Sequence, residues 1–169
     1  MIGGLDYARG VGAATVSLAC NGDAEISKYA QIAIEVPVGP EILTGSTRLK
    51  AGTAQKLVLN MLSTGAMIGI GKVYKNLMVD VRSTNEKLIE RAKRMIRQAT
   101  GCDEATAASS FEVTNHDVKL AIVMTLTGLG PAAARRRLEQ ANGFVVNAIK
   151  EDVTKEDVIK EDVTKEEKR

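Results

Sequence analysis

The chain has 169 residues, of which 44% are hydrophobic and 26% are charged, and its formal net charge is +2. This apolar content is enough for a packed core, and so small a net charge excludes the strongly basic class of nucleic-acid-binding proteins. The sequence opens with no recognisable leader and contains no run of the ~18 apolar residues that a membrane-spanning helix needs, so we expect a soluble cytoplasmic protein.

The first part of the chain alternates helical and strand-like segments. Both strand-like segments are almost continuous apolar runs, which is typical of parallel sheets covered on both faces. The predicted elements are a helix at residues 2–12, a strand at 14–20, a short helix at 23–30 capped by Asp23, and a strand at 31–38. This alternation predicts an α/β fold. Two apolar strands need neighbours, so we expect the sheet to be incomplete.

A run of polar residues at positions 39–56, G-P-E-I-L-T-G-S-T-R-L-K-A-G-T-A-Q-K, joins the second strand to a long apolar helix. We expect that helix to extend to about Ile70 and to be buried. Arg48 and Lys50 lie near its start, where the helix dipole disfavours cations by about 0.3–1 kcal/mol each. A bound anion is the usual compensation. The run therefore predicts a small-anion site.

Two alternatives stay open within this run. The hydroxyls of Thr44, Ser46 and Thr47, together with the Lys50 ammonium, suit phosphate and sugar oxygens; alternatively, Thr44 or Ser46 only caps the helix. Glu41 is either a sugar-binding or proton-transferring group, or a surface carboxylate that complements the helix dipole.

The second part of the chain predicts a small all-helical bundle. Its first helix begins with a capping box formed by Ser83 and Glu86 and ends at Gly101. The other predicted helices are residues 103–111, a helix capped by Asn115, residues 132–142 after Pro131, and residues 144–149.

The C-terminal tail has a different composition. Residues 150–165 repeat K-E-D-V-[TI] three times, and residues 151–169 carry eight acidic and five basic side chains. A period of five places the valines on no common helix face. We expect a solvated, part-helical or disordered extension, with docking to a partner as the alternative.

The remaining polar motifs favour structural roles. Cys20 and Cys102 lie far apart without metal-ligand spacing, which predicts buried reduced thiols, with a disulfide or a reactive thiol as the alternatives. His116 is predicted to be exposed and structural. The basic run at residues 135–137 lacks aromatic neighbours, which favours a solvated helix face over a nucleic-acid site.

The run at residues 39–56 resembles the signature of the N-acetylmuramic acid 6-phosphate etherases and the related glucokinase regulatory proteins, both of the sugar isomerase (SIS) superfamily. Residues 57–68, 71–81, 84–88, 99–102 and 121–124, and the segment at Gly143, also resemble the etherases. The resemblance covers about residues 2–150.

The resemblance implies an α/β fold: the C-terminal part of a doubly wound parallel-sheet SIS domain, followed by a small all-α, ubiquitin-associated-like bundle. The implied domains are residues 1–81, the partial phosphosugar-binding domain, residues 82–150, the helical bundle, and residues 151–169, the charged tail. Compared with the family, about the first half of the SIS domain is expected to be absent.

The implied activity is that of a carbon–oxygen lyase in peptidoglycan recycling. The etherases cleave the D-lactyl ether of the muramic acid phosphate to N-acetylglucosamine 6-phosphate and D-lactate, by elimination and hydration without metal or organic cofactor. The resemblance also implies a homodimer. The implied substrate-binding residues are Glu41, Thr44, Ser46, Thr47 and Lys50. The family's acid–base glutamates belong to the missing half, so no catalytic residue is assigned.

Two further functions remain open. One is a non-catalytic module that binds or senses phosphosugars, because the regulatory proteins share the signature. The other is a split enzyme that is active only with a complementing N-terminal half.

Overall fold

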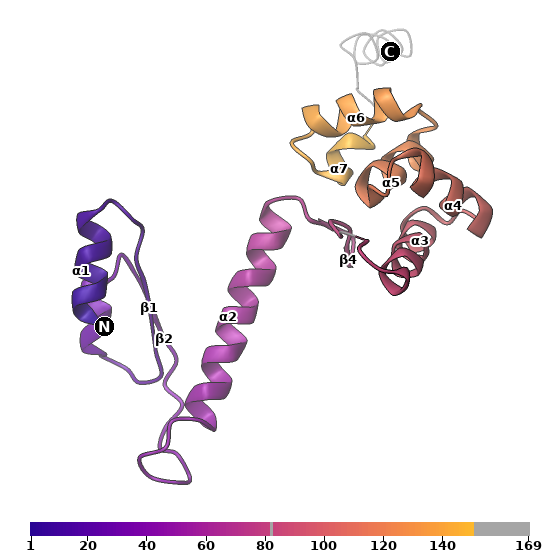
Figure 1. Ribbon diagram of the computed structural model, residues 1–169. Coiled ribbons are helices and arrows are strands. Elements are labelled where there is room, and N and C mark those ends of the chain that lie inside the picture. The colour runs from indigo at the N-terminus through magenta and orange to yellow at the C-terminus, as the bar shows by residue number, and fades with distance from the viewer. Residues whose placement is uncertain (82, 151–169) are drawn as a thin grey trace, which may run out of the picture. The chain divides into compact units, whose positions relative to one another are not determined.

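The computed structural model describes residues 1–81 and 83–150. The charged repeat predicted for residues 151–169 lies outside these described residues. The chain divides into two compact units, Met1–Ala66 and Met67–Arg169 (Figure 1). No helix within residues 1–81 and 83–150 has the length and apolar content required to cross a lipid bilayer.

The first unit contains a two-stranded parallel sheet. Strands β1 and β2 pair from Val16 opposite Ile32 to Ala19 opposite Glu35, and this confirms the parallel arrangement predicted from their apolar composition (Figure 1). Helix α1 contacts the 3₁₀ helix η1, which also packs on both strands. The element bounds are α1 Ile2–Gly10, β1 Val16–Ala19, η1 Glu25–Tyr29 and β2 Ile32–Glu35.

The turn after β1 is held by Glu35 at the end of β2. The Glu35 carboxylate accepts the backbone N–H groups of Asp23 at 2.9 Å and Ala24 at 3.0 Å, and also the Ser27 hydroxyl. The Ser27 hydroxyl and the Ala24 N–H are the main causes that lower the pKa of Glu35. The predicted Asp23 cap is therefore wrong: Asp23 has a left-handed backbone with φ 53°, whereas a capping residue is extended.

Helix α2, Lys50–Gly69, is present as predicted and is drawn as one uninterrupted rod in Figure 1. Its 20 residues span about 30 Å. The predicted burial is wrong, however, because Ala51 is the only buried residue among those 20. Leu59 and Met61 are 59% and 68% exposed. Two short strands and two short helices offer too little surface to cover a 20-residue helix with so many apolar side chains.

The second unit opens with a hairpin that the sequence analysis did not predict. Strands β3, Val73–Tyr74, and β4, Leu77–Met78, pair antiparallel. Lys75, in the two-residue connection, has φ 54°, as the tight turns of such hairpins require. Its ammonium donates to the Ala99 carbonyl oxygen at 3.2 Å, so the hairpin is tied to the last turn of helix α3, Glu86–Thr100.

The helices of the second unit lie where the sequence predicts them, but two of their caps differ. Asn85 accepts the Leu88 N–H at 2.9 Å, and Asp117 accepts the Leu120 N–H at 3.0 Å. Ser83 lies too early to cap α3, and Asn115 has a left-handed backbone with φ 54°. The bounds are α3 Glu86–Thr100, α4 Glu104–Val113, α5 Val118–Thr127, α6 Pro131–Gln140 and α7 Val145–Ala148.

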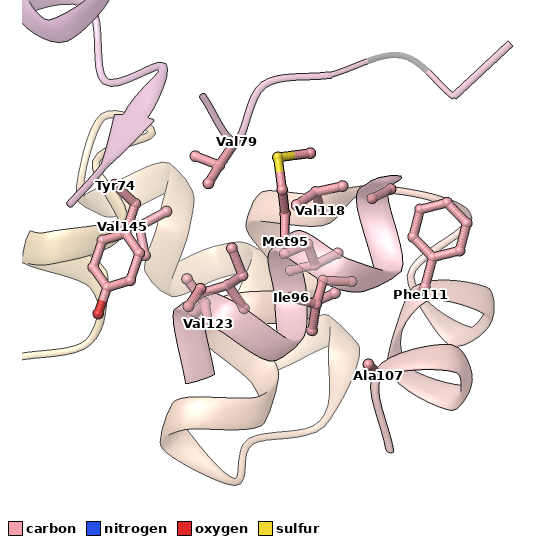
Figure 2. Packing of buried hydrophobic residues seen from close by; sticks show 14 of the residues in the cluster. Tyr74, Val79, Met95, Ile96, Ala107, Phe111, Val118, Val123 and Val145 are labelled. Atoms are coloured by element: carbon pink, nitrogen blue, oxygen red, sulfur yellow. The ribbon is translucent and has the colours of Figure 1, made fainter. Parts of the chain in front are cut away.

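One hydrophobic core joins these helices to the hairpin. Figure 2 shows Ile96 of α3, Phe111 of α4 and Val123 of α5 in this core, all of them fully buried. Tyr74 and Val79 bring the hairpin segment into the same cluster. The second unit therefore has its own hydrophobic core.

Candidate functional site

The candidate site is the loop between β2 and α2, residues 39–49. Gly39 and Gly45 have φ values of 71° and 86°, a region in which a side chain would be strained. A turn inside the loop is closed by the Ser46 N–H, which donates to the Leu43 carbonyl oxygen at 3.1 Å. The loop is mostly exposed, and only Glu41 and Ser46 of residues 41–50 are partly buried.

Glu41 closes this loop onto the start of α2. Its Oε2 accepts the Lys50 backbone N–H, and its Oε1 accepts the Ala51 backbone N–H, each at 3.0 Å. The chain itself therefore supplies an anion at the helix start, in the arrangement that the dipole-complementing alternative for Glu41 predicts. The N–H of Lys50, and then that of Ala51, lowers the pKa of Glu41, so the carboxylate is ionised at neutral pH.

The three hydroxyls of the loop keep their hydrogen-bonding capacity. Within residues 1–81 and 83–150, the hydroxyls of Thr44, Ser46 and Thr47 make no hydrogen bond to the protein. The alternative that Thr44 or Ser46 caps α2 through its side chain is therefore wrong. The same described residues offer no carboxylate within 4.0 Å of Arg48 or Lys50 to form an ion pair.

The chemistry available in this loop is binding rather than proton transfer. Hydroxyl donors and an ammonium on an exposed loop can hydrogen-bond phosphate or sugar oxygens. The ionised Glu41 carboxylate has no proton to donate at neutral pH, and the two N–H groups that lower its pKa also make it a weaker base. All five predicted substrate-binding residues therefore lie in or beside one loop, but Glu41 differs from the others because its oxygens are already engaged.

Cys20 makes a contact with α2 that no sequence signal indicated. It follows β1, and its Sγ donates to the Ala51 carbonyl oxygen at 3.5 Å. The first turn of α2 is thus joined to the carboxyl end of β1. Both cysteines are free thiols, as predicted, but each is only partly buried.

His116 has the structural role that the sequence analysis predicted. Its ring stacks on Phe111 with centroids 4.6 Å apart and an interplanar angle of 5°. Its Nε2 lies 3.3 Å from Oε2 of Glu112. These contacts hold the turn between α4 and α5.

Comparison with known proteins gives strong matches to etherases. The chain is 73% identical over 151 residues to the N-acetylmuramic acid 6-phosphate etherase of Oenococcus oeni, covering 89% of this chain and 51% of that protein. It is 69% identical to N-acetylmuramic acid 6-phosphate etherase 2 of Lactiplantibacillus plantarum, covering 88% and 50%. The etherase of Bacillus anthracis is 62% identical, covering 88% and 51%. No family model matches the chain.

The chain spans about half the length of the curated relatives that it matches. The resemblance to the C-terminal portion of the N-acetylmuramic acid 6-phosphate etherases, stated from the run at residues 39–56 and the segments after it, is thereby confirmed.

Proposed function

We propose that this chain is the phosphosugar-binding C-terminal part of an N-acetylmuramic acid 6-phosphate etherase. The observation that carries the proposal is the 73% identity to the Oenococcus oeni etherase. In this proposal residues 1–81 are part of an SIS domain, residues 82–150 a ubiquitin-associated-like helical domain, and residues 151–169 a separate segment. The protein acts in the cytoplasm, in amino sugar catabolism and peptidoglycan recycling.

In the proposed reaction the complete enzyme cleaves the D-lactyl ether of its substrate to N-acetylglucosamine 6-phosphate and D-lactate. Elimination requires removal of a proton next to a carbonyl, and hydration requires activation of water. We assign neither step to a residue of this chain, because both oxygens of the Glu41 carboxylate already accept backbone N–H groups, and its lowered pKa makes it a weaker base. The acid and base come from the remainder of the enzyme.

Thr44, Ser46, Thr47 and Lys50 bind the phosphosugar in this proposal, and Glu41 belongs to the same loop. Support comes from the three hydroxyls, which have no protein partner among the described residues, and from the Lys50 ammonium, which has no ion pair there. The phosphate of the ligand lies against these groups and not on the N–H groups of Lys50 and Ala51, which Glu41 occupies.

A second polypeptide covers α2 in the active enzyme. Five large apolar side chains of α2 are each at least half exposed: Leu57, Leu59, Met61, Leu62 and Ile68. Burying a side chain of this kind contributes about 1.5–3 kcal/mol to stability. Such a surface favours association, either with a complementing N-terminal half or with another copy in a homodimer. The alternative function, a non-catalytic phosphosugar-binding module, is favoured by the lack of an assignable acid or base in the candidate loop.

Complementation tests this function. The chain is incubated with N-acetylmuramic acid 6-phosphate, alone and with the separately expressed N-terminal half of the Oenococcus oeni etherase, and released D-lactate is assayed. We expect release only from the mixture. Release by the lone chain would contradict our placement of the acid and base elsewhere. Binding of the sugar without release from the mixture would favour the non-catalytic module.

Replacement of Lys50 tests the binding site. Lys50→Ala removes a charge-assisted hydrogen bond, a contribution of about 1.5–3 kcal/mol, so we expect the affinity for N-acetylglucosamine 6-phosphate to fall at least tenfold in calorimetric titration. Lys28→Ala is the control, because Lys28 is an exposed lysine of the same unit that is paired with Glu25. Equal dissociation constants for Lys50→Ala and wild type would remove Lys50 from the site.

A further inference from the structure

Within residues 1–81 and 83–150, one side chain, that of Glu41, connects the two ends of the candidate loop, residues 39–49. Its C-terminal end is continuous with α2, where the Gly52 N–H donates to the Thr47 carbonyl oxygen at 3.0 Å. Its N-terminal end meets α2 through the two hydrogen bonds of Glu41. The other hydrogen bond inside the loop, between Ser46 and Leu43, is local and does not join the ends. Glu41 is therefore the group that closes residues 42–49 into a defined loop.

We propose that Glu41 is a positioning residue of the phosphosugar site: it holds the loop that carries Thr44, Ser46 and Thr47 in place through the backbone of α2, and it does not touch the ligand. This inference rests on the proposed function and assigns Glu41 a different part in it. Both carboxylate oxygens accept adjacent N–H groups at 3.0 Å, so contact with a sugar hydroxyl would compete with these bonds.

The charge of Glu41 supports an indirect role. A carboxylate beside an anion site repels the incoming phosphate, so direct contact between the two is unfavourable. The same charge stabilises the start of α2, where its field is favourable. Holding three hydroxyls in one arrangement before the ligand arrives reduces the ordering entropy that binding would otherwise cost. The binding free energy gained by holding the hydroxyls in place therefore has to exceed the loss from repulsion between Glu41 and the phosphate.

The decisive comparison is between two glutamates with matched roles. Glu35 also accepts two adjacent backbone N–H groups in the first unit, but it holds the turn after β1 and not the candidate loop. We expect Glu41→Ala to weaken binding of N-acetylglucosamine 6-phosphate to the full chain at least tenfold. Glu35→Ala, compared at a temperature where both variants are folded by circular dichroism, should bind within twofold of wild type.

Nuclear magnetic resonance separates positioning from direct contact. In wild type, acidification should move the Lys50 and Ala51 amide signals with a midpoint below the ordinary glutamate pKa of 4.5, because protonation weakens the acceptor. Glu41→Gln should abolish this titration. Saturation with N-acetylglucosamine 6-phosphate at pH 7 should leave both amides hydrogen-bonded, with unchanged protection from solvent exchange.

The outcomes distinguish this inference from the function on which it rests. If wild type does not bind N-acetylglucosamine 6-phosphate, the proposed function is wrong. If wild type binds but Glu41→Ala loses no more affinity than Glu35→Ala, Glu41 is not a positioning residue. If the two amides lose their protection when the ligand binds, Glu41 has moved to the ligand and the contact is direct.

Discussion

Replacing Phe111 with alanine is expected to destabilise the second unit by about 3–5 kcal/mol, the usual cost of truncating a fully buried phenylalanine. Phe111 has no exposed surface and is among the largest of the fully buried side chains of this unit (Figure 2). The substitution also removes the ring on which His116 stacks. Because a small domain is stable by only about 5–15 kcal/mol, the loss should be visible as a large shift of the urea midpoint.

Val113→Ala is the matched control for Phe111→Ala. Val113 lies on the same helix, α4, but its side chain is 56% exposed. We expect its effect to remain below about 1 kcal/mol, as for most surface substitutions. Similar urea midpoints for the two variants would mean that Phe111 does not anchor this core.

The second large effect is expected at Gly71, which follows α2. Gly71 has φ +73°, and a Cβ built on it would lie 3.1 Å from the Gly143 carbonyl oxygen and 3.2 Å from the Phe144 ring. Gly71→Ala therefore combines a left-handed backbone, which costs a residue with a side chain about 1–2 kcal/mol, with a close contact to backbone. We expect a destabilisation of roughly 2–4 kcal/mol, measured by urea unfolding.

Gly128→Ala isolates the contact from the backbone effect. Gly128 has nearly the same φ, +70°, but nothing lies within 4 Å of a Cβ built there. Both substitutions reduce the entropy of the unfolded chain equally. The difference between their losses in free energy of unfolding therefore measures how closely Gly71 approaches residues 143–144. An equal loss of free energy of unfolding for Gly71→Ala and Gly128→Ala would show that Gly71 does not pack tightly against residues 143–144.

The first unit leaves polar groups and apolar surface uncovered. Its loop has unengaged hydroxyls, its sheet has two strands, and α2 exposes apolar side chains along its length. In the proposed function, a second polypeptide covers this apolar surface and supplies the acid and the base. The complementation assay is therefore the most informative functional experiment.

Several features of the candidate site could be predicted from sequence because they are local. Thr44, Ser46, Thr47 and Lys50 lie within seven consecutive positions, so any backbone path keeps them close. The need for an anion at the start of α2 followed from the cations placed there. The identity of that anion did not follow, because Glu41 meets the Lys50 N–H nine residues away only if the loop folds back.

The helix caps also could not be assigned from the sequence alone. Asn115 and Asp117 are both good capping residues by type, and the sequence analysis chose the wrong one. Asn115 and His116 form the turn after α4 and both have left-handed backbone, with φ 54° and 68°. Asn115 therefore lacks the extended backbone of a capping residue. The stacking of His116 on Phe111 accompanies this turn, and Phe111 is positioned by the core rather than by its neighbours in sequence.

The amino-acid sequence by itself determined the positions of the long helices, the parallel pairing of two apolar strands and the resemblance to the etherases, because periodicity, composition and an uninterrupted motif are properties of neighbouring residues. Only the tertiary structure decided that Glu41 caps α2, that Lys75 ties a hairpin to α3, and that α2 is exposed. Burial and long-range hydrogen bonds depend on what packs against a segment. The sequence therefore shows that the side chains of α2 are apolar, whereas the tertiary structure decides whether another surface buries them.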